Sequence, residues 1–595
     1  MQNQKWTRLV PVVVAILGTL EFHRYTILSG FDAVQADNGD SRYIAFVLEH
    51  WNAFAHGLVR LGSPPIFFPV QGTLGYSDAL AGMGIVHIAL RALGLGVFTA
   101  MNVQLVALTP ASFWAAHLFL ARGFRLGVWA ATVGAAFFAF CWPRFAELVH
   151  VQMQFTFVVP LLGLLALECL RDGAGLRRTG FAWRALGFVA LLALAMATTV
   201  YLAEFSLLFI GASAAPSLLS RTARRHYGLL LRRQWPGLLA AAALGAALAW
   251  PIARVYVPVM RQSGGRPWTE VRTYLLDPVD LVWMGRENTV WGWLFARWHD
   301  LAVEKWPGKR LGIGLVATLA WLGACAWAVR ALRRREDAVA ALIILGAAFV
   351  QVAILQFGGW SLWWLLWEAV PGLRGLRAVG RMQLVATLPM ALGFAILIER
   401  SAWPRWALAL LVAAAAVEQT GMVQRYSARD AEALAHRVAA AIPRTCKAAY
   451  VVPGPDLLPP PAPITDESHF DADAYLRANP DVASGWKGSA WSHYEAFGRR
   501  EQRSLSPDYA RWHMAMMFFY NYTVPMAAVL TGIPVVNGLS GWQPPGWDLF
   551  DVFRPDAPEK LAQWLALNHR SPAEVCIVRL DLPYTSLPTI ELWKD

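Results

Sequence analysis

The feature that most constrains this chain is a succession of apolar runs, each close to the length that crosses a bilayer as a helix. A spanning helix needs about 20 mainly apolar residues. The 595-residue chain is 56% hydrophobic and only 15% charged, whereas soluble domains are about one quarter charged. The sequence therefore predicts an all-α polytopic membrane bundle of about eleven transmembrane helices. The predicted spans are residues 9–29, 99–121, 126–142, 155–171, 185–201, 203–219, 236–257, 310–329, 338–357, 382–398 and 406–421.

The charge between these runs predicts their orientation. With the N-terminus inside, eleven spans place all five arginine-rich loops on the inner side, as the positive-inside rule requires. These loops are residues 122–125, 171–184, 221–233, 330–335 and 400–405. The outer side then carries residues 30–98, 143–154, 258–309 and 358–381. The net charge of +12 follows from membrane topology, so nucleic-acid binding is not predicted.

One further apolar run, residues 78–96, does not fit this scheme. Counting it as a span would reverse the orientation of every later loop. We therefore expect an interfacial or re-entrant helix there, which is tolerated where it lines a cavity in the protein. The membrane domain predicted in this way covers residues 1–421.

The tail, residues 422–595, has shorter apolar runs and predicts an α/β domain outside the membrane. Residues 447–453 and 573–582 have the pattern of strands, and residues 558–570 have that of an amphipathic helix. Cys446 and Cys576 lie at the edges of the two strands and could pair in an oxidising compartment. No CxxC or Cys/His cluster is present, so no metal site is predicted.

Ionisable residues gather in the predicted outer loops. Asp37 and Asp40 follow the first span, and Glu147 and His150 lie in the short second loop. Arg374, Arg377 and Arg381 end the fourth loop at spacings that predict one helical face. A carboxylate can act as general base on a hydroxyl, and arginine binds phosphate through paired hydrogen bonds. These residues together suit the transfer of a sugar from a lipid phosphate.

Simpler interpretations stand beside this one. The two aspartates also suit an Asx-type turn that ends a helix, and Glu147 with His150 also suits a surface pair on a helix end. The three arginines also suit side chains that reach lipid headgroups.

Further candidates for an acceptor or cavity lie at two places. Tyr201 and Glu204 stand at a predicted outer helix junction, where ionisable residues are functional candidates. Asn537 and Ser540 lie in the turn-rich stretch 526–547, which is able to fold over such a cavity or simply to pack.

Several stretches resemble membrane glycosyltransferases of the GT-C type. Those stretches are GDSRYIAFVLEHW (39–51), SPPIFFPVQGTLGYSD (63–78) and ELVHVQMQFTFVVPLL (147–162). VPGLRGLRAVGRMQL (370–384) resembles related bacterial proteins, including the YfhO-like group, and residues 526–547 resemble a segment that closes many such chains.

The resemblance implies a bundle with its active site at the outer membrane surface, a polyprenyl-phosphate sugar donor and an inverting transfer. By motif position it implies Asp40 as the general base, and Glu147 and His150 match its second-loop site. Asp37 is a further catalytic candidate from its place beside Asp40 alone. Arg42 and His150 join the three arginines as expected phosphate ligands. The family's paired acids after the first helix and its Asp-x-Asp in the second loop are absent, so a divalent metal is doubtful.

The stretch FDADAYLRANPDVASGWKGSAWSHYEAFGRREQR (470–503) resembles a short helical repeat of secreted bacterial proteins. The shared pattern is Tyr-Leu-x-x-Asn-Pro-Asp-Val followed by His-Tyr-x-x-x-Gly-x-x-Glu. Only one copy is present, so there is no second repeat for it to stack on. We expect an accessory module inserted in the tail domain.

The sequence thus predicts an integral-membrane glycosyltransferase with a cell-envelope glycan, lipid or protein as acceptor. Its expected location is the bacterial inner membrane, with the tail on the periplasmic or extracellular side. One alternative is a transporter or lipid flippase, although no repeat between the two halves of the chain supports it. A second alternative is a non-catalytic envelope-assembly protein in which the tail is the working part.

Overall fold

A computed structural model describes residues 2–294, 309–370, 372–454, 466–501 and 503–582. The chain divides into two compact units. Unit 1 comprises Met1–Asp37 and Asp78–Ala428, and unit 2 comprises Asn38–Ser77 and Arg429–Asp595. Most of the first predicted outer loop therefore folds with the C-terminal residues, because its helix α3 (Asp40–Ala55) packs against α24 (Pro507–Thr531).

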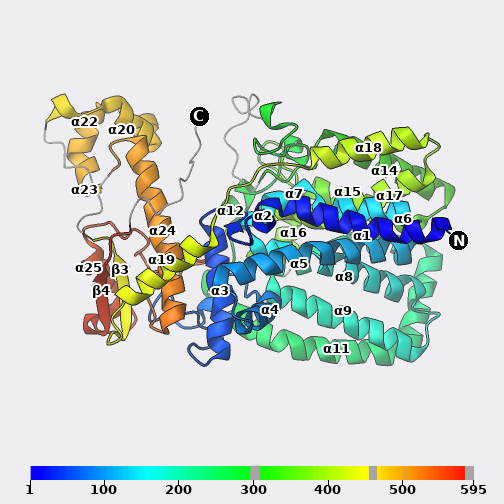
Figure 1. Ribbon diagram of the computed structural model, residues 1–595, viewed down its shortest axis with the longest axis horizontal. Coiled ribbons are helices and arrows are strands. Elements are labelled where there is room, and N and C mark those ends of the chain that lie inside the picture. The colour runs from blue at the N-terminus through cyan, green and yellow to red at the C-terminus, as the bar shows by residue number, and fades with distance from the viewer. Residues whose placement is uncertain (1, 295–308, 371, 455–465, 502, 583–595) are drawn as a thin grey trace. The chain divides into compact units, whose positions relative to one another are not determined.

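The long helices of unit 1 run side by side as a bundle (Figure 1). Its extensive helix–helix contacts include those of α9 with α11, α5 with α6, and α10 with α15. A short antiparallel pair, β1 (Ala33–Val34) with β2 (Tyr426–Ser427), joins the beginning of the unit to its end. The helices are α1 (Gln2–Phe22), α2 (Arg24–Leu28), α4 (Ala81–Ala92), α5 (Val97–Leu118), α6 (Val128–Phe140), α7 (Trp142–Ala146), α8 (Val158–Leu167), α9 (Arg178–Thr198), α10 (Val200–Ala214), α11 (Arg221–Ser263), α12 (Trp268–Thr273), α14 (Leu315–Arg334), α15 (Ala338–Ala353), α16 (Trp363–Ala369), α17 (Gln383–Arg400) and α18 (Arg405–Glu418).

Each of the predicted spans overlaps a helix of unit 1. The run 78–96 forms α4, whose 12 residues measure about 18 Å at about 1.5 Å per residue. That length is too short to cross a hydrocarbon core of about 30 Å.

Helix α11 is much longer than its predicted span, with 43 residues. It begins directly after Ser220, whose side chain accepts a hydrogen bond from the Ala223 amide at 3.5 Å. It therefore includes the whole predicted basic loop 221–233, since arginine and leucine are good helix formers. It ends at Gly264, whose φ of 71° is the left-handed conformation that often closes a helix.

Among the described residues, eight helical segments are long and apolar enough to cross a membrane. Seven belong to unit 1, and the eighth, Trp512–Thr531, belongs to unit 2. The apolar window of this eighth helix is 72% buried inside the protein, against 6% for Arg221–Ser263. Its side chains therefore serve packing, whereas most of those in the apolar window of α11 face outward. The helices of unit 1 indicate a multi-pass membrane protein.

Those residues of the predicted outer loops that belong to unit 1 meet at one end of it, which we call the site end. There an ion pair joins Arg381 to Glu147, and Asp78 accepts a hydrogen bond from the Val200 amide. The arginine-rich loops meet at the opposite, basic end, where ion pairs join Arg122 to Glu168 and Arg400 to Asp337. The predicted separation of the two loop sets is therefore present in the bundle.

Unit 2 is built on two parallel strands, β3 (Ala448–Val452) and β4 (Val575–Arg579). All five residues of β3 are buried. Val535 lies beside β3 and forms a parallel bridge with Ala449. Both strands fall within predicted strands, and α25 (Ala557–Leu567) overlaps the predicted helix. The other helices are α19 (Ala428–Ala441), α20 (Ala472–Ala478), α21 (Pro480–Gly485), α22 (Ala490–His493) and α23 (Arg499–Glu501).

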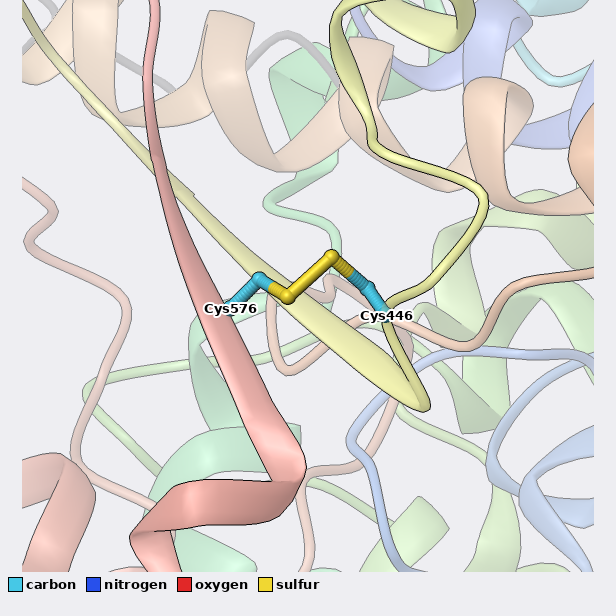
Figure 2. Close-up of a disulfide and its surroundings, with 2 residues drawn as sticks. All are labelled: Cys446 and Cys576. Atoms are coloured by element: carbon cyan, nitrogen blue, oxygen red, sulfur yellow. A yellow bond between two sulfur atoms is a disulfide. The ribbon is translucent and has the colours of Figure 1, made fainter.

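A disulfide joins Cys446, just before β3, to Cys576 within β4 (Figure 2). The two Cα atoms lie 5.8 Å apart, and 130 residues separate the two cysteines in sequence. The bond closes most of the C-terminal segment of unit 2 into one covalent loop.

The repeat-like stretch 470–503 forms a small helical cluster with its own core. Tyr475 and Tyr494 are buried there together, and the Tyr475 hydroxyl lies 2.9 Å from Nδ1 of His493. A Cβ on Gly498 would lie 2.5 Å from that hydroxyl, so only glycine fits. The residues of the repeat pattern are therefore the residues that hold the cluster together.

Candidate functional site

Three predicted site residues from two different loops form one cluster at the site end of unit 1. Oε2 of Glu147 lies 2.9 Å from Nδ1 of His150 and 3.2 Å from Nε of Arg381. The Glu147 side chain is only 2% exposed, that of Arg381 is 10% exposed and that of His150 is 20% exposed. A buried carboxylate of this kind is stable only with such partners. Two short turns that follow α7 place Glu147 and His150 on the same side.

The three predicted arginines do not share a helical face, contrary to the expectation from their spacing. They lie on an arginine turn, residues 373–381, built from two short turns with an extended Leu376 between them. Gly372, with φ of 97°, precedes the turn and prevents a continuous helix there. The three guanidiniums therefore reach three carboxylates. The pairs are Arg374 with Glu368 at 2.6 Å, Arg377 with Glu270 at 3.8 Å, and Arg381 with Glu147 at 3.2 Å.

Tyr201, predicted to line a cavity, holds this turn in place. Its hydroxyl accepts hydrogen bonds from the backbone amides of Arg377 and Ala378, both at 3.2 Å. The guanidinium of Arg381 lies 5.3 Å from the centre of its ring, within the range of a cation–π contact. The tyrosine thus positions two of the three arginines.

Arg266 belongs to the same region but was not among the predicted residues. Its Nη1 lies 3.0 Å from Oε1 of Glu270, and its backbone amide donates to the carbonyl of Arg374 at 2.7 Å. Burial lowers the pKa of Arg266 below its ordinary value; Glu270 opposes the shift, and the charge of Arg377 adds to it. The i,i+4 spacing of Arg266 and Glu270 is the sequence signal that could have drawn attention to it.

Asp78 is a second residue that the sequence did not single out. Its carboxylate accepts hydrogen bonds from the Val200 amide at 3.1 Å and from the Thr199 hydroxyl at 3.2 Å, and so it caps the start of α10. Burial raises the pKa of Asp78, and the Val200 hydrogen bond and the charge of Arg381 oppose this rise. An aspartate 121 residues from its hydroxyl partner gives no local sequence signal.

Glu204 lies one helical turn beyond Tyr201 and is partly buried in α10. Its Oε2 is a buried atom without a hydrogen-bond partner among the described residues. A Cβ on Gly372 would lie 2.9 Å from its Oε1. The Glu204 carboxyl therefore lies directly against Gly372, the glycine that precedes the arginine turn.

The predicted base Asp40 belongs to unit 2, whereas Asp37, half-buried, is the last residue of the first segment of unit 1. Asp40 begins α3, and its Oδ1 accepts a hydrogen bond from the Tyr522 hydroxyl at 2.5 Å. Arg42, expected to bind phosphate, is only 4% exposed. It donates to Oδ1 of Asn38 at 2.6 Å and lies 5.5 Å from the ring centre of Phe519.

The two predicted residues of the stretch 526–547 have different surroundings within unit 2. Asn537 is fully buried: its Oδ1 accepts from the Val451 amide at 2.8 Å, and its Nδ2 donates to the Val451 carbonyl at 2.9 Å. This side chain extends the pairing of β3, so we assign it a structural role. Ser540 is partly exposed, and its hydroxyl lies 2.9 Å from that of Tyr43.

The cluster at the site end offers two kinds of chemistry. A carboxylate or an imidazole can accept a proton from a hydroxyl, and arginines can stabilise negative charge that develops on a phosphate. Among the described residues, no group of three or more His, Cys, Asp or Glu side chains is placed to hold a metal ion.

The likeness of this chain to known proteins lies in structure rather than in sequence. No protein-family model matches the chain, and no curated protein matches it. Among solved structures, it is similar to the oligosaccharyltransferase of Archaeoglobus fulgidus, crystallised as a complex with Zn and sulfate. The match covers 71% of this chain and 55% of that chain, with 13% identity and a TM-score of 0.37. The chain thus matches little more than half the length of that protein, and the likeness carries no residue role to it.

Proposed function

We propose that the protein is an integral-membrane glycosyltransferase that moves a sugar from a polyprenyl-phosphate donor to a hydroxyl of a cell-envelope acceptor. The acceptor oxygen attacks the anomeric carbon, and the bond from that carbon to the phosphate oxygen breaks. Polyprenyl phosphate leaves with the electron pair of that bond, and a base takes the hydroxyl proton. Attack from the face opposite the leaving group inverts the anomeric carbon.

The observation that carries this proposal is the placement of Arg377 at an end of the membrane bundle. Its side chain is 39% exposed and lies 3.8 Å from Glu270, the carboxylate that Arg266 contacts at 3.0 Å. A partly exposed guanidinium with a distant carboxylate can turn to a phosphate at little cost, since solvent already weakens that ion pair. Arg381, four residues later in the arginine turn, supplies a second positive charge.

The base within unit 1 is Glu147, the predicted residue that the structure places beside Arg381. Arg381 and His150 both contact Oε2 of this carboxylate and fix its orientation. Asp40 stays a prediction from the family resemblance. It belongs to unit 2, and its role has a test of its own.

We place the protein in the bacterial inner membrane as a multi-pass protein. The basic end of unit 1 faces the cytoplasm by the positive-inside rule, so the site end faces the periplasm or exterior. Unit 2 lies on that outer side as well. The disulfide Cys446–Cys576 supports this placement, because disulfides persist in oxidising compartments.

The test is transfer of radiolabelled sugar from polyprenyl-phosphate donors in native membranes, which supply the acceptor. Arg377→Gln is expected to lower kcat/KM by roughly 10- to 100-fold through the lost charge. Glu147→Gln is expected to lower kcat by about 10²- to 10⁴-fold through the lost base. Arg333→Gln, an exposed arginine near the C-terminal end of α14, is the matched control and should stay within about twofold of wild type.

Asp40→Asn runs in the same assay. Loss of transfer in a folded Asp40→Asn protein, with Glu147→Gln nearly active, would move the base to unit 2. The reverse pattern would remove Asp40 from catalysis. Wild-type levels of transfer in Arg377→Gln would contradict the phosphate-binding role of the arginine turn.

A further inference from the structure

A segment outside the membrane-spanning helices exposes four large apolar side chains. Phe357 is 54% exposed, Trp360 62%, Trp364 43% and Leu365 53%. They lie within nine consecutive residues of the loop between α15 and α17, and we call them the aromatic patch. Soluble surfaces rarely expose apolar groups so close together without a binding role.

The aromatic patch stands on a rigid base. Phe357 and Trp360 exchange both backbone hydrogen bonds, at 2.8 and 3.0 Å, across a tight turn. The two residues of that turn, Gly358 and Gly359, have φ of 57° and 87°, which glycine adopts without strain. Trp363, at the start of α16, is fully buried and anchors the helix. The backbone hydrogen bonds of the turn and the buried Trp363 therefore fix the backbone that carries the exposed rings.

The patch continues an apolar surface that faces lipid. Phe349 and Val352, in the last turns of α15, are 59% and 49% exposed. Their i,i+3 spacing puts them on one side of the helix. Tryptophan also concentrates where hydrocarbon meets headgroups. A patch of exposed tryptophans just beyond the end of an apolar helix suits the level where lipid chains end and headgroups begin.

The last turn of α16 contacts the arginine turn through Trp367 and Glu368. The ring of Trp367 lies 4.9 Å from the Arg374 guanidinium carbon and 5.6 Å from the ring of Trp268. Arg374 also pairs with Glu368 at 2.6 Å, with both side chains nearly half exposed. Arg377 follows three residues later. An apolar surface and a cationic surface thus adjoin in one short stretch of chain.

We propose that the aromatic patch binds the apolar chain of a lipid whose phosphate lies at Arg374 and Arg377. The choice of a phosphate-bearing lipid rests on the proposed function, but lipid binding can be measured without sugar transfer. The ligand class is a single long isoprenyl chain that ends in a phosphate. The rings of Trp360 and Trp364 hold the first units of the chain, and the arginine turn holds its head.

The test compares the affinity of the full-length protein in detergent for a long-chain polyprenyl phosphate and for a short, water-soluble isoprenyl phosphate. Trp360→Ser/Trp364→Ser is expected to bind the long chain roughly tenfold more weakly, because apolar contact area is lost. Its affinity for the short chain should be unchanged. Trp403→Ser/Trp406→Ser removes two tryptophans of similar exposure, 59% and 68%, near the start of α18 and should change neither affinity.

A third variant tests the binding of the lipid phosphate. Arg377→Gln should weaken both phosphates equally and abolish the preference for polyprenyl phosphate over polyprenol. Wild-type affinity of Trp360→Ser/Trp364→Ser for the long chain would overturn the proposal and leave the patch as a contact with bulk bilayer only. Equal weakening of both chain lengths in that variant would overturn it as well, and so would a wild-type protein that does not prefer the long chain.

The two proposals fail differently. A wild-type protein that binds the long-chain phosphate through the patch, yet transfers no sugar, would contradict the proposed function and leave this inference standing. Sugar transfer that does not depend on chain length or on Trp360 and Trp364 would do the opposite.

Discussion

The arginine turn of unit 1 and the segment 534–541 of unit 2 are two glycine-containing loops that were both predicted to form part of a site, and they are built in opposite ways. In the arginine turn, Arg374 and Arg377 stay 44% and 39% exposed and contact carboxylates through their side chains. In the segment of unit 2, Asn537 is fully buried, and both polar atoms of its amide bond to the backbone of Val451.

This difference separates residues that can bind a ligand from residues that hold the fold. A half-exposed ion pair contributes little to stability, so its arginine can exchange a carboxylate for a phosphate. A buried amide that completes a strand's hydrogen bonds cannot leave without exposing unpaired backbone groups. Loss of contacts in unit 2 should therefore cost stability, and changes in the arginine turn should cost mainly ligand binding.

The largest effect on stability is expected from the disulfide of unit 2. Cys446→Ser/Cys576→Ser should lower the free energy of unfolding of unit 2 by about 4 kcal/mol, because the loop it closes is long. Hydrogen exchange of peptides from residues 429–582 in the full-length protein measures it. Cys325→Ala, a cysteine of unit 1 outside the disulfide, is the control. Equal exchange in all three proteins would show that the bond adds nothing to the unit.

The next largest effect should come from Asn537. Asn537→Ala leaves the amide and carbonyl of Val451 without their side-chain partner and should destabilise unit 2 by about 3 kcal/mol. Ser540→Ala, three residues later, loses one partly exposed hydrogen bond and should cost less than about 1 kcal/mol. Thermal unfolding followed by limited proteolysis separates the two. Similar losses in both variants would contradict the contrast between framework and binding residues.

A smaller effect is expected from Tyr201, whose hydroxyl fixes the arginine turn. Tyr201→Phe removes the acceptor for the amides of Arg377 and Ala378 and should cost about 1 kcal/mol of stability. Its affinity for polyprenyl phosphate should nevertheless fall severalfold, since Arg377 loses its position. Unchanged affinity would mean that the turn keeps its shape without the hydroxyl. Tyr227→Phe, at the basic end, is the matched control.

The smallest effect concerns the pH dependence of unit 1. Burial raises the pKa of Asp78 above its ordinary value of 3.8, so the folded protein holds this proton more readily than the unfolded chain. The contribution of Asp78 to stability is therefore fully present below pH 3.8 and is lost as pH rises through the raised pKa.

Asp78→Asn should remove that dependence. The variant should match the wild type in acid and become the more stable of the two toward neutral pH, as measured by thermal unfolding in detergent across that range. Asp172→Asn, an exposed aspartate at the basic end, serves as the control. A constant difference between Asp78→Asn and wild type at every pH would contradict the assignment.

Much of unit 1 could be predicted because its helices are local features. An apolar run of sufficient length is enough to predict a helix, and every predicted span overlaps a helix. The orientation of these helices across the membrane stays a prediction from the positive-inside rule. Glu147 and Arg381 were each named as candidates because both lie in loops assigned to one side, but their contact was not predicted. The Cys446–Cys576 bond likewise followed from two cysteines at strand edges.

The remaining features depend on contacts between distant residues, which one sequence does not reveal. Asp78 caps α10 more than 100 residues later in the chain. The three arginines of the arginine turn have helical spacing. Gly372, with its positive φ, prevents a continuous helix there, so each arginine pairs with a different carboxylate. The buried place of Asn537 depends on Val451, 86 residues away. In each case the local sequence pattern is compatible with several structures, and contacts with residues far away in the sequence determine which one forms.

Unit 2 is discontinuous in sequence, because residues 38–77 and residues 429–595 form it together. Its helix α24 packs on α3, which is encoded more than 400 residues earlier, between the first and second long helices of unit 1. A single recombination event before Arg429 would therefore transfer α24 without α3 and would expose the apolar face that α3 covers. Unit 2 is therefore not a simple terminal extension of the chain, because its fold needs a segment that precedes most of unit 1.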